Sequence, residues 1–392
     1  MLLCVGGSEL TIQRTDIEAE ARLERGMADV VAATTRLSHV DGVEGKLSYC
    51  GYDVIDLARY ATYEETAYLL LYGDLPSSTQ LSALRSELAR NRRVNPALLQ
   101  MLRALPGAPT SMEVLRTLVS AMSALDPSPL DKSQDANLRR AKRLISQLPT
   151  LLTAHLRLRQ GEEPIQPNED LGHAANLYYM LHGSAPDALE TRILDMAFIL
   201  MAEHELNAST FAVRVVASTL SDLFAAFIAG MGALNGPLHG AANTESMKML
   251  LEIGSEANVE TYVQGALAAK RKIMGFGHRV YRTWDPRAVI LREMLSKLNG
   301  DLPAVHWCKL ADRVQDTVFK TKALYPNVDF YAGPALYGMG FPMEAFPAIF
   351  ACARSVGWAA HALEQYADNR LIRPTAQYVG PVNRVYRPLQ ER

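Results

Sequence analysis

Apolar residues recur at helical spacing along most of the chain, and polar caps or glycines separate the runs. Thr62 and Glu65 have the spacing of a capping box ahead of AYLLLYG, which Gly73 ends. Thr110 and Glu113 repeat this spacing ahead of VLRTLVSAMSAL. Because each capping box is followed by a periodic apolar run, both segments are predicted to be helices.

The same pattern continues to the end of the chain, so the fold class is predicted to be mostly α. Further helices are expected after Ser77 or Ser78, after Asn95-Pro96 toward Pro106-Gly107, over residues 135–160 with a kink or break at Pro149, over 187–203 and 209–234, and from Asp285-Pro286 to Asn299-Gly300. Strand signals are few, with candidates at residues 45–52 and within 9–14.

Composition narrows the class of protein. The chain has 392 residues with 40 Lys and Arg against 42 Asp and Glu, so it lacks the basic excess typical of nucleic-acid binding. Its longest apolar run, Leu223 to Leu234, is shorter than the roughly 20 residues needed to span a bilayer. The four cysteines form no C-x-x-C pair, and the opening MLLCVGGSEL has no basic region of a signal peptide. We therefore predict a cytoplasmic protein with free thiols.

Four segments combine polar residues with glycine or a helix boundary, and they are the candidates for chemistry: residues 204–207, 236–240, 275–279 and 327–333. HELNA at 204–208 lacks the second histidine of a zinc-binding H-E-x-x-H, so no metal site is predicted. No P-loop and no G-x-S-x-G nucleophile elbow occurs in the chain. Acid–base chemistry by histidine and carboxylate remains.

His239 precedes a predicted helix, and a helix N-terminus favours a neutral imidazole. A neutral imidazole can donate a hydrogen bond to a carbonyl oxygen as that group becomes an enolate, as in triosephosphate isomerase. Taken alone, the residue is equally well explained as a structural histidine in a turn. Asp329 stands among apolar neighbours, so it is either a desolvated base or an ordinary cap aspartate.

Positive charge is concentrated near His278. Arg282 follows it, and Arg287 falls in the first turn of the helix predicted from Asp285-Pro286. Two cations, a histidine and a helix N-terminus within ten residues suit a small carboxylate substrate.

Taken together, the motifs resemble the citrate synthase family in its shorter bacterial and archaeal form. The matching pieces are HELNASTF, GPLHGAAN, MGFGHRVYRTWDPRA, NVDFYAG, the AR of ACARSVGWAAHALEQ, RPTAQYVGP, and upstream VVAATTRLSHVDGVEGKLSYCGYDVIDLA and ETAYLLLYGDLP. The resemblance extends from about residue 26 to the end.

The resemblance implies a multi-helical fold with a large and a small domain and an active-site cleft between them. Mapped onto this chain, residues 1–25 would be an N-terminal arm, 26–240 and 346–392 the large domain, and 241–345 the small domain. Domain closure would then assemble the site and exclude water.

It also implies the role of each candidate residue. Asp329 would remove a methyl proton of acetyl-CoA, His239 would stabilise the enol or enolate, and His278 would donate to the keto oxygen of oxaloacetate. The residues expected to bind oxaloacetate are His204, Arg287, Arg354 and Arg373, the last reaching into the partner subunit of a homodimer. Those expected to bind coenzyme A are Arg271, Lys272, Ile273, Gly275, Arg282 and Asn327.

The implied activity is condensation of acetyl-CoA with oxaloacetate and water to give citrate and CoA, with no cofactor. Alternatives are 2-methylcitrate synthase acting on propionyl-CoA, a catalytically silent paralogue, and a CoA-dependent lyase. Two positions depart from the family pattern: Cys50 and Thr375 stand where many relatives have arginine.

Overall fold

The computed structural model describes residues 26–27, 30–105, 110–298 and 303–392. Within them the chain forms sixteen α-helices and one small sheet, which confirms the mostly α prediction. The helices are α1 Val54–Tyr60, α2 Tyr63–Tyr72, α3 Ser78–Asn91, α4 Pro96–Ala104, α5 Ser111–Ala124, α6 Gln134–Arg159, α7 His173–His182, α8 Ala188–Ala202, α9 Ala208–Ser218, α10 Leu223–Leu234, α11 Ala242–Ile253, α12 Val259–Ala268, α13 Pro286–Leu295, α14 Pro303–Lys322, α15 Val328–Gly338 and α16 Phe346–Ala367.

Most helices begin where their capping residues predict. Thr62 and Thr110 form full capping boxes with Glu65 and Glu113. Asn95 caps α4, with Pro96 at its first position. These starts follow from side chains within one turn of the backbone they cap, so the local sequence is sufficient to predict them.

Two predicted helices differ in the structure. The expected helix over 209–234 is two helices, α9 and α10. Leu220 adopts a left-handed backbone at φ 61°, and Asp222 caps the second helix because its side chain accepts the N–H of Ala225. The helix from Pro286 ends at Leu295, earlier than expected, since Ser296 closes it. Pro149 does not break α6, which runs through it as one helix.

The sheet is antiparallel in the order β1-β2-β3, with β1 Ser38–Asp41, β2 Lys46–Tyr49 and β3 Tyr52–Asp53. Ser38 pairs with Tyr49 at one end of the β1–β2 hairpin, and Asp41 pairs with Lys46 at the other. The hairpin predicted at 45–52 is confirmed as β2 and β3, whereas β1 was not expected. The candidate strand within 9–14 lies outside the described residues.

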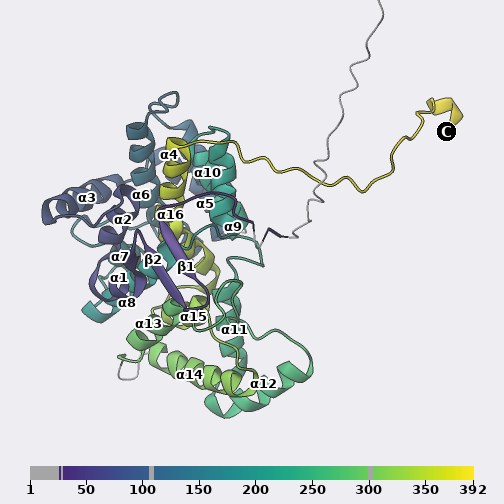
Figure 1. Cartoon of the computed structure of the whole chain (residues 1–392). Coiled ribbons are helices and arrows are strands. Elements are labelled where there is room, and N and C mark those ends of the chain that lie inside the picture. Colours follow the sequence, from purple (N-terminus) through teal and green to yellow (C-terminus); the bar gives the residue numbers. More distant parts are fainter. Residues whose placement is uncertain (1–25, 28–29, 106–109, 299–302) are drawn as a thin grey trace, which may run out of the picture. The chain divides into compact units, whose positions relative to one another are not determined.

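Helix α16 runs through the centre of the molecule, where α2, α6, α8, α9 and α10 pack around it (Figure 1). It buries Trp358 completely and Arg354 to 1% exposure. A guanidinium in a core helix implies that a polar site adjoins it, because a charge without partners is costly to bury.

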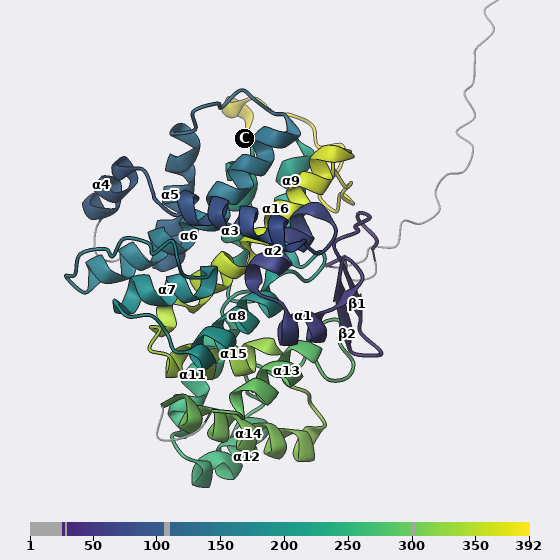
Figure 2. The same ribbon diagram turned by 90° about the vertical axis from the view of Figure 1, so that its left-hand side faces the viewer.

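Helices α11 to α15 pack on one another at the lower end of both views (Figures 1 and 2). They also contact α1, α8 and α16, and residues 35–372 form one compact unit. The division into a large domain and a small domain at 241–345 therefore stays a prediction.

The described residues up to Thr34 and residues 373–392 form a second unit. It contains a short 3₁₀ helix, Leu389–Glu391, and Arg392 stacks on the Tyr386 ring. Among the described residues, no helix is long and apolar enough to cross a membrane.

Candidate active site

Two histidines that are far apart in sequence lie side by side. His204 follows α8 and is 7% exposed, and its ring centroid lies 5.3 Å from that of His278. Tyr281 joins them: its hydroxyl lies 3.2 Å from His204 Nε2, and its ring centroid is 4.6 Å from that of His278. Burial, with the nearby charge of Arg287, lowers the pKa of His204 well below its usual value, so this ring is neutral.

The hydrogen bonds of His278 indicate which of its nitrogens carries the proton. Val280 N and Tyr281 N both donate to Nδ1, at 3.0 and 3.2 Å. Nδ1 is therefore an acceptor, and in the neutral ring the proton sits on Nε2. Burial lowers the pKa of His278 to about 4, which keeps the ring neutral at pH 7. The residue thus offers one N–H donor to a substrate oxygen.

Arg287 is held in place by a buried carboxylate. Asp285, 1% exposed, accepts Arg287 Nε at 3.0 Å and Nη2 at 2.8 Å. The same carboxylate accepts Val328 N at 3.2 Å, so it also holds the first residue of α15. The guanidinium is consequently fixed before any substrate arrives, which suits recognition of a carboxylate.

His239 faces the N-terminus of α9. Its Nε2 accepts Ser209 N at 3.2 Å and lies 2.9 Å from Ser209 Oγ. This leaves the proton of the neutral ring on Nδ1. Burial, aided by the charge of Arg354, lowers the pKa of His239 to about 4. The sequence predicted a neutral histidine at a helix start, but the helix start that it contacts belongs to α9, 30 residues upstream.

Asp329 is in the first turn of α15, where Asn327 Oδ1 accepts its backbone N–H at 3.1 Å. Burial raises the pKa of Asp329 to about 6, although Arg287 and Arg354 act in the opposite direction. A carboxylate with this pKa is ionised at pH 7 and a stronger base than an exposed one. Arg354 donates its Nε to Met201 O at 2.6 Å, and its charge influences both His239 and Asp329.

The residues expected to bind coenzyme A divide into two groups. Asn327 and Gly275 lie together: Asn327 N donates to Gly275 O at 2.9 Å and its side chain to Gly277 O at 3.0 Å. Gly275 has φ 79°, and a Cβ there would approach Phe330 Cβ to 2.8 Å, so only glycine fits. The other group, Arg271, Lys272 and Arg282, is exposed, and Ile273 is buried. The guanidinium of Arg271 lies 5.4 Å from the centroid of the Tyr262 ring.

Sequence reasoning missed Ser209, Tyr281 and Asp285, which contact the predicted residues directly. All three lie inside the motifs HELNASTF and MGFGHRVYRTWDPRA, and their place in these motifs is the sequence signal that could have found them. Arg373 is exposed and belongs to the second unit. No group of three or more His, Cys, Asp or Glu side chains in the described part of the chain could hold a metal ion.

The chain is similar to known proteins over most of its length. The model of the citrate synthase C-terminal domain matches residues 26–375. Citrate synthase of Haloferax volcanii is 44% identical over 94% of this chain and 99% of its own, and 2-methylcitrate synthase of Mycobacterium tuberculosis is 38% identical over 94% and 93%. The crystal structure of citrate synthase from Thermotoga maritima has a TM-score of 0.84 at 41% identity, covering 94% of this chain and 99% of its own.

The citrate synthase of Thermoplasma acidophilum was solved as a ternary complex with carboxymethyl coenzyme A and oxaloacetate. It has a TM-score of 0.87 and 34% identity to this chain, covering 94% of this chain and 99% of its own. The family model and these relatives all extend over most of the chain, including every motif that carries the candidate site in residues 35–372. The chain therefore belongs to the citrate synthase family.

Proposed function

We propose that the chain condenses acetyl-CoA with oxaloacetate and water to give citrate and CoA. The observation that carries this proposal is the hydrogen bonding of two histidine rings, together with the desolvation of one carboxylate. His239 and His278 are neutral rings, each with one N–H still available, and Asp329 is a carboxylate whose pKa is raised to about 6. Two oxygen-directed donors and one base are what an enolisation followed by attack on a ketone requires.

In the first step, the Asp329 carboxylate takes a proton from the methyl group of acetyl-CoA. A carboxylate is far too weak a base to hold that proton by itself, because its reference pKa is about 4. The Nδ1–H of His239 therefore donates to the thioester oxygen as negative charge develops there. Because the His239 ring starts neutral, this donor carries no positive charge that would bind the ground state equally well.

In the second step, the enol carbon attacks the keto carbon of oxaloacetate, and a carbon–carbon bond forms. The Nε2–H of His278 donates to the ketone oxygen as negative charge develops there, and the proton that Asp329 took from the methyl group is returned, so that this oxygen becomes a hydroxyl. Arg287 and Arg354 hold the carboxylates of oxaloacetate. Their two positive charges balance the two negative charges of this substrate. Water then cleaves the thioester of the resulting citryl-CoA, which releases citrate and the CoA thiol.

Release of the CoA thiol tests this proposal. Acetyl-CoA and propionyl-CoA are each supplied with and without oxaloacetate, and the protein's own cysteines are subtracted. We expect oxaloacetate-dependent release with a higher kcat/KM for acetyl-CoA, and no loss of rate when a chelator is added. A higher kcat/KM for propionyl-CoA would assign 2-methylcitrate synthesis. The two thioesters differ by one methylene, for which a pocket can discriminate by about 1–3 kcal/mol. No release from either thioester would indicate a catalytically silent paralogue.

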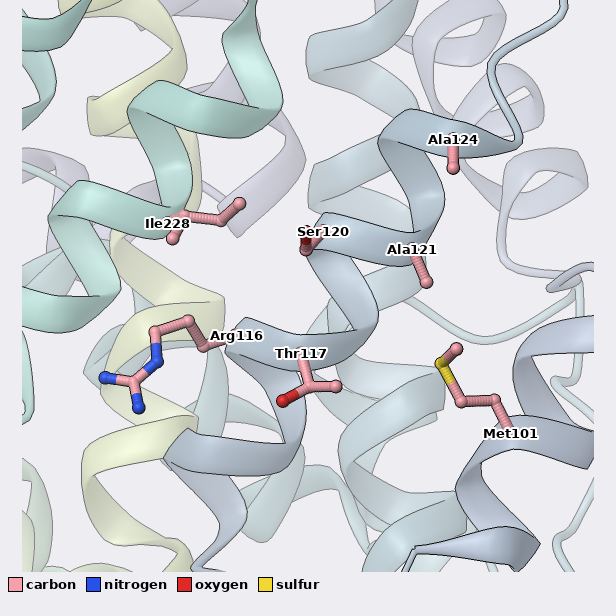
Figure 3. A pocket seen from close by; sticks show the side chains of 7 residues that line it. All are labelled: Met101, Arg116, Thr117, Ser120, Ala121, Ala124 and Ile228. Carbon is pink, nitrogen blue, oxygen red and sulfur yellow. The ribbon is translucent and has the colours of Figure 1, made fainter.

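We also propose that the chain works as a homodimer. A groove of about 550 Å³ between α4, α5 and α10 is lined by the apolar side chains of Met101 and Ile228, by the cation Arg116 and by four small side chains of α5 (Figure 3). They are Met101, Arg116, Thr117, Ser120, Ala121, Ala124 and Ile228. None of them belongs to the candidate active site. Small side chains let helices of two subunits approach closely, so this face supports the dimer that the family resemblance implies.

Arg373 is proposed to act in the partner's active site, and mixing two inactive variants tests this. Arg373→Ala and Arg354→Ala are each expected to lose most activity, because each removes a cation from the oxaloacetate site. After subunit exchange, a mixed dimer holds one site with both arginines, so part of the activity should return. Absence of recovery, with exchange demonstrated by differently tagged subunits, would contradict the cross-subunit role.

A further inference from the structure

The β1–β2 hairpin contacts both of the loops that carry the oxaloacetate histidines. In both views it points from the upper helices toward the loop ahead of α13 (Figures 1 and 2). Its two ends make different contacts, one set around His204 and the other beside His278.

The open end of the hairpin holds the residues on either side of His204. Ser38 Oγ donates to Glu203 Oε1 at 2.9 Å and accepts Glu205 N at 3.0 Å. Tyr49, the partner of Ser38 in the hairpin, donates its hydroxyl to Glu203 O at 2.8 Å. Glu203 and Tyr49 are completely buried, so these bonds are shielded from water.

The Glu203 carboxylate extends this anchorage into the core. His361 Nε2 lies 2.9 Å from its Oε1, and His361 Nδ1 lies 3.2 Å from Arg214 of α9. The His204 loop is thereby tied to β1, α9 and α16 at once. Its position follows the hairpin because Ser38 bonds to both neighbours of the histidine.

The turn of the hairpin holds the loop after His278. Arg282 N donates to Gly42 O at 2.8 Å, and a Cβ on Gly42 would come within 2.4 Å of Val280 O. At Gly45, with φ 66°, a Cβ would lie 2.8 Å from Trp284 O. Backbone therefore packs directly on backbone at the turn, which only glycine permits.

Val280 and Arg282 flank Tyr281, and Tyr281 bridges the two histidines through its hydroxyl and its ring. Val280 N also donates to His278 Nδ1. A shift of the turn would thus move both the tyrosine bridge and the hydrogen bond that fixes the His278 tautomer. The short strand β1 separates the two anchor points by a fixed distance, since a strand rises about 3.3 Å per residue.

We infer that the β1–β2 hairpin is a positioning element for oxaloacetate, which sets the separation of His204 and His278 through Ser38 at one end and Gly42 at the other. This inference rests on the proposed function. Ser38 and Gly42 bond to residues of the two histidine loops, so we place their effect on oxaloacetate there.

Substitution of Gly42 tests the inference in the full-length enzyme. Gly42→Ala forces the turn away from Val280, and the KM for oxaloacetate is expected to rise about tenfold or more. The KM for acetyl-CoA should also rise in Gly42→Ala, because Arg282, which is expected to bind coenzyme A, bonds to Gly42. In Ser38→Ala it should change less than about twofold, because Ser38 bonds to Glu203 and Glu205, beside His204. Amide hydrogen exchange of residues 280–284 should become faster. Ser38→Ala, at the open end of the hairpin, should also raise the KM for oxaloacetate. This variant covers the case that Gly42→Ala does not fold.

Gly51→Ala is the matched control. Gly51 lies in the other turn of the same sheet at φ 90°, and a Cβ there meets nothing within 4 Å. It should lower the melting temperature through backbone strain but leave both KM values unchanged. Equal effects of Gly51→Ala and Gly42→Ala on the KM for oxaloacetate, or none from Gly42→Ala and Ser38→Ala, would overturn the inference. Absence of condensation in the unsubstituted enzyme would instead overturn the proposed function.

Discussion

Asp329→Asn is expected to lower kcat at least about a hundredfold, because an amide cannot accept the methyl proton of acetyl-CoA. The variant should fold, because the cap at the start of α15 uses the backbone N–H of residue 329, which donates to Asn327 Oδ1 and is kept in the variant. A neutral amide is also easier to bury than a carboxylate. Oxaloacetate affinity, measured by calorimetry, should change little, as the arginines and His278 are intact.

The pH profile supplies an independent check on Asp329. In the unsubstituted enzyme, kcat/KM should fall as the pH decreases through about 6, because the protonated acid is no longer a base. His239 and His278 stay neutral in this range, since their pKa values are lowered to about 4. The residual activity of Asp329→Asn should lack this decrease near pH 6.

Asp195→Asn is a suitable control for the loss of a perturbed carboxylate. Burial raises the pKa of Asp195 to about 7, and this side chain accepts Tyr63 N in α2, away from the candidate site. Its kcat should remain within about twofold of the unsubstituted enzyme. Near-normal turnover in Asp329→Asn, or an equal loss in Asp195→Asn, would contradict the role of Asp329 as the base.

His239→Ala is the second change with a large expected effect. It removes the Nδ1–H donor to the thioester oxygen, and one such donor is worth about 10²–10³ in kcat. We expect a loss of at least about a hundredfold in kcat, with oxaloacetate binding retained. Stopped assays with radiolabelled acetyl-CoA would measure such low rates.

Two further variants make the His239 result specific. Ser209→Ala keeps the backbone N–H that bonds Nε2 and loses only the hydroxyl contact, so its effect should be much smaller. His182→Ala removes a histidine that stacks on Tyr178 outside the site and should leave kcat unchanged. A turnover of His239→Ala close to that of His182→Ala would remove His239 from the mechanism.

Local sequence was sufficient for the helix starts. Thr62, Thr110 and Asn95 cap their helices with side chains that reach only the next turn, so each start depends on neighbouring residues alone. His239, His278 and Asp329 were candidates from short motifs, but their expected roles came from the family resemblance that these motifs carry together.

The tertiary structure decided how these residues behave. The proton of His239 is on Nδ1 because Ser209 lies opposite, and the two histidines proposed to bind oxaloacetate meet through Tyr281. The break at Leu220 and the strand β1 were likewise not evident from the apolar pattern. Protonation, burial and strand pairing depend on atoms contributed by distant segments, and a linear pattern holds no information on which segments will meet. The sequence therefore determined what chemistry this chain contains, whereas the packing decided where each proton lies and which loop the hairpin holds.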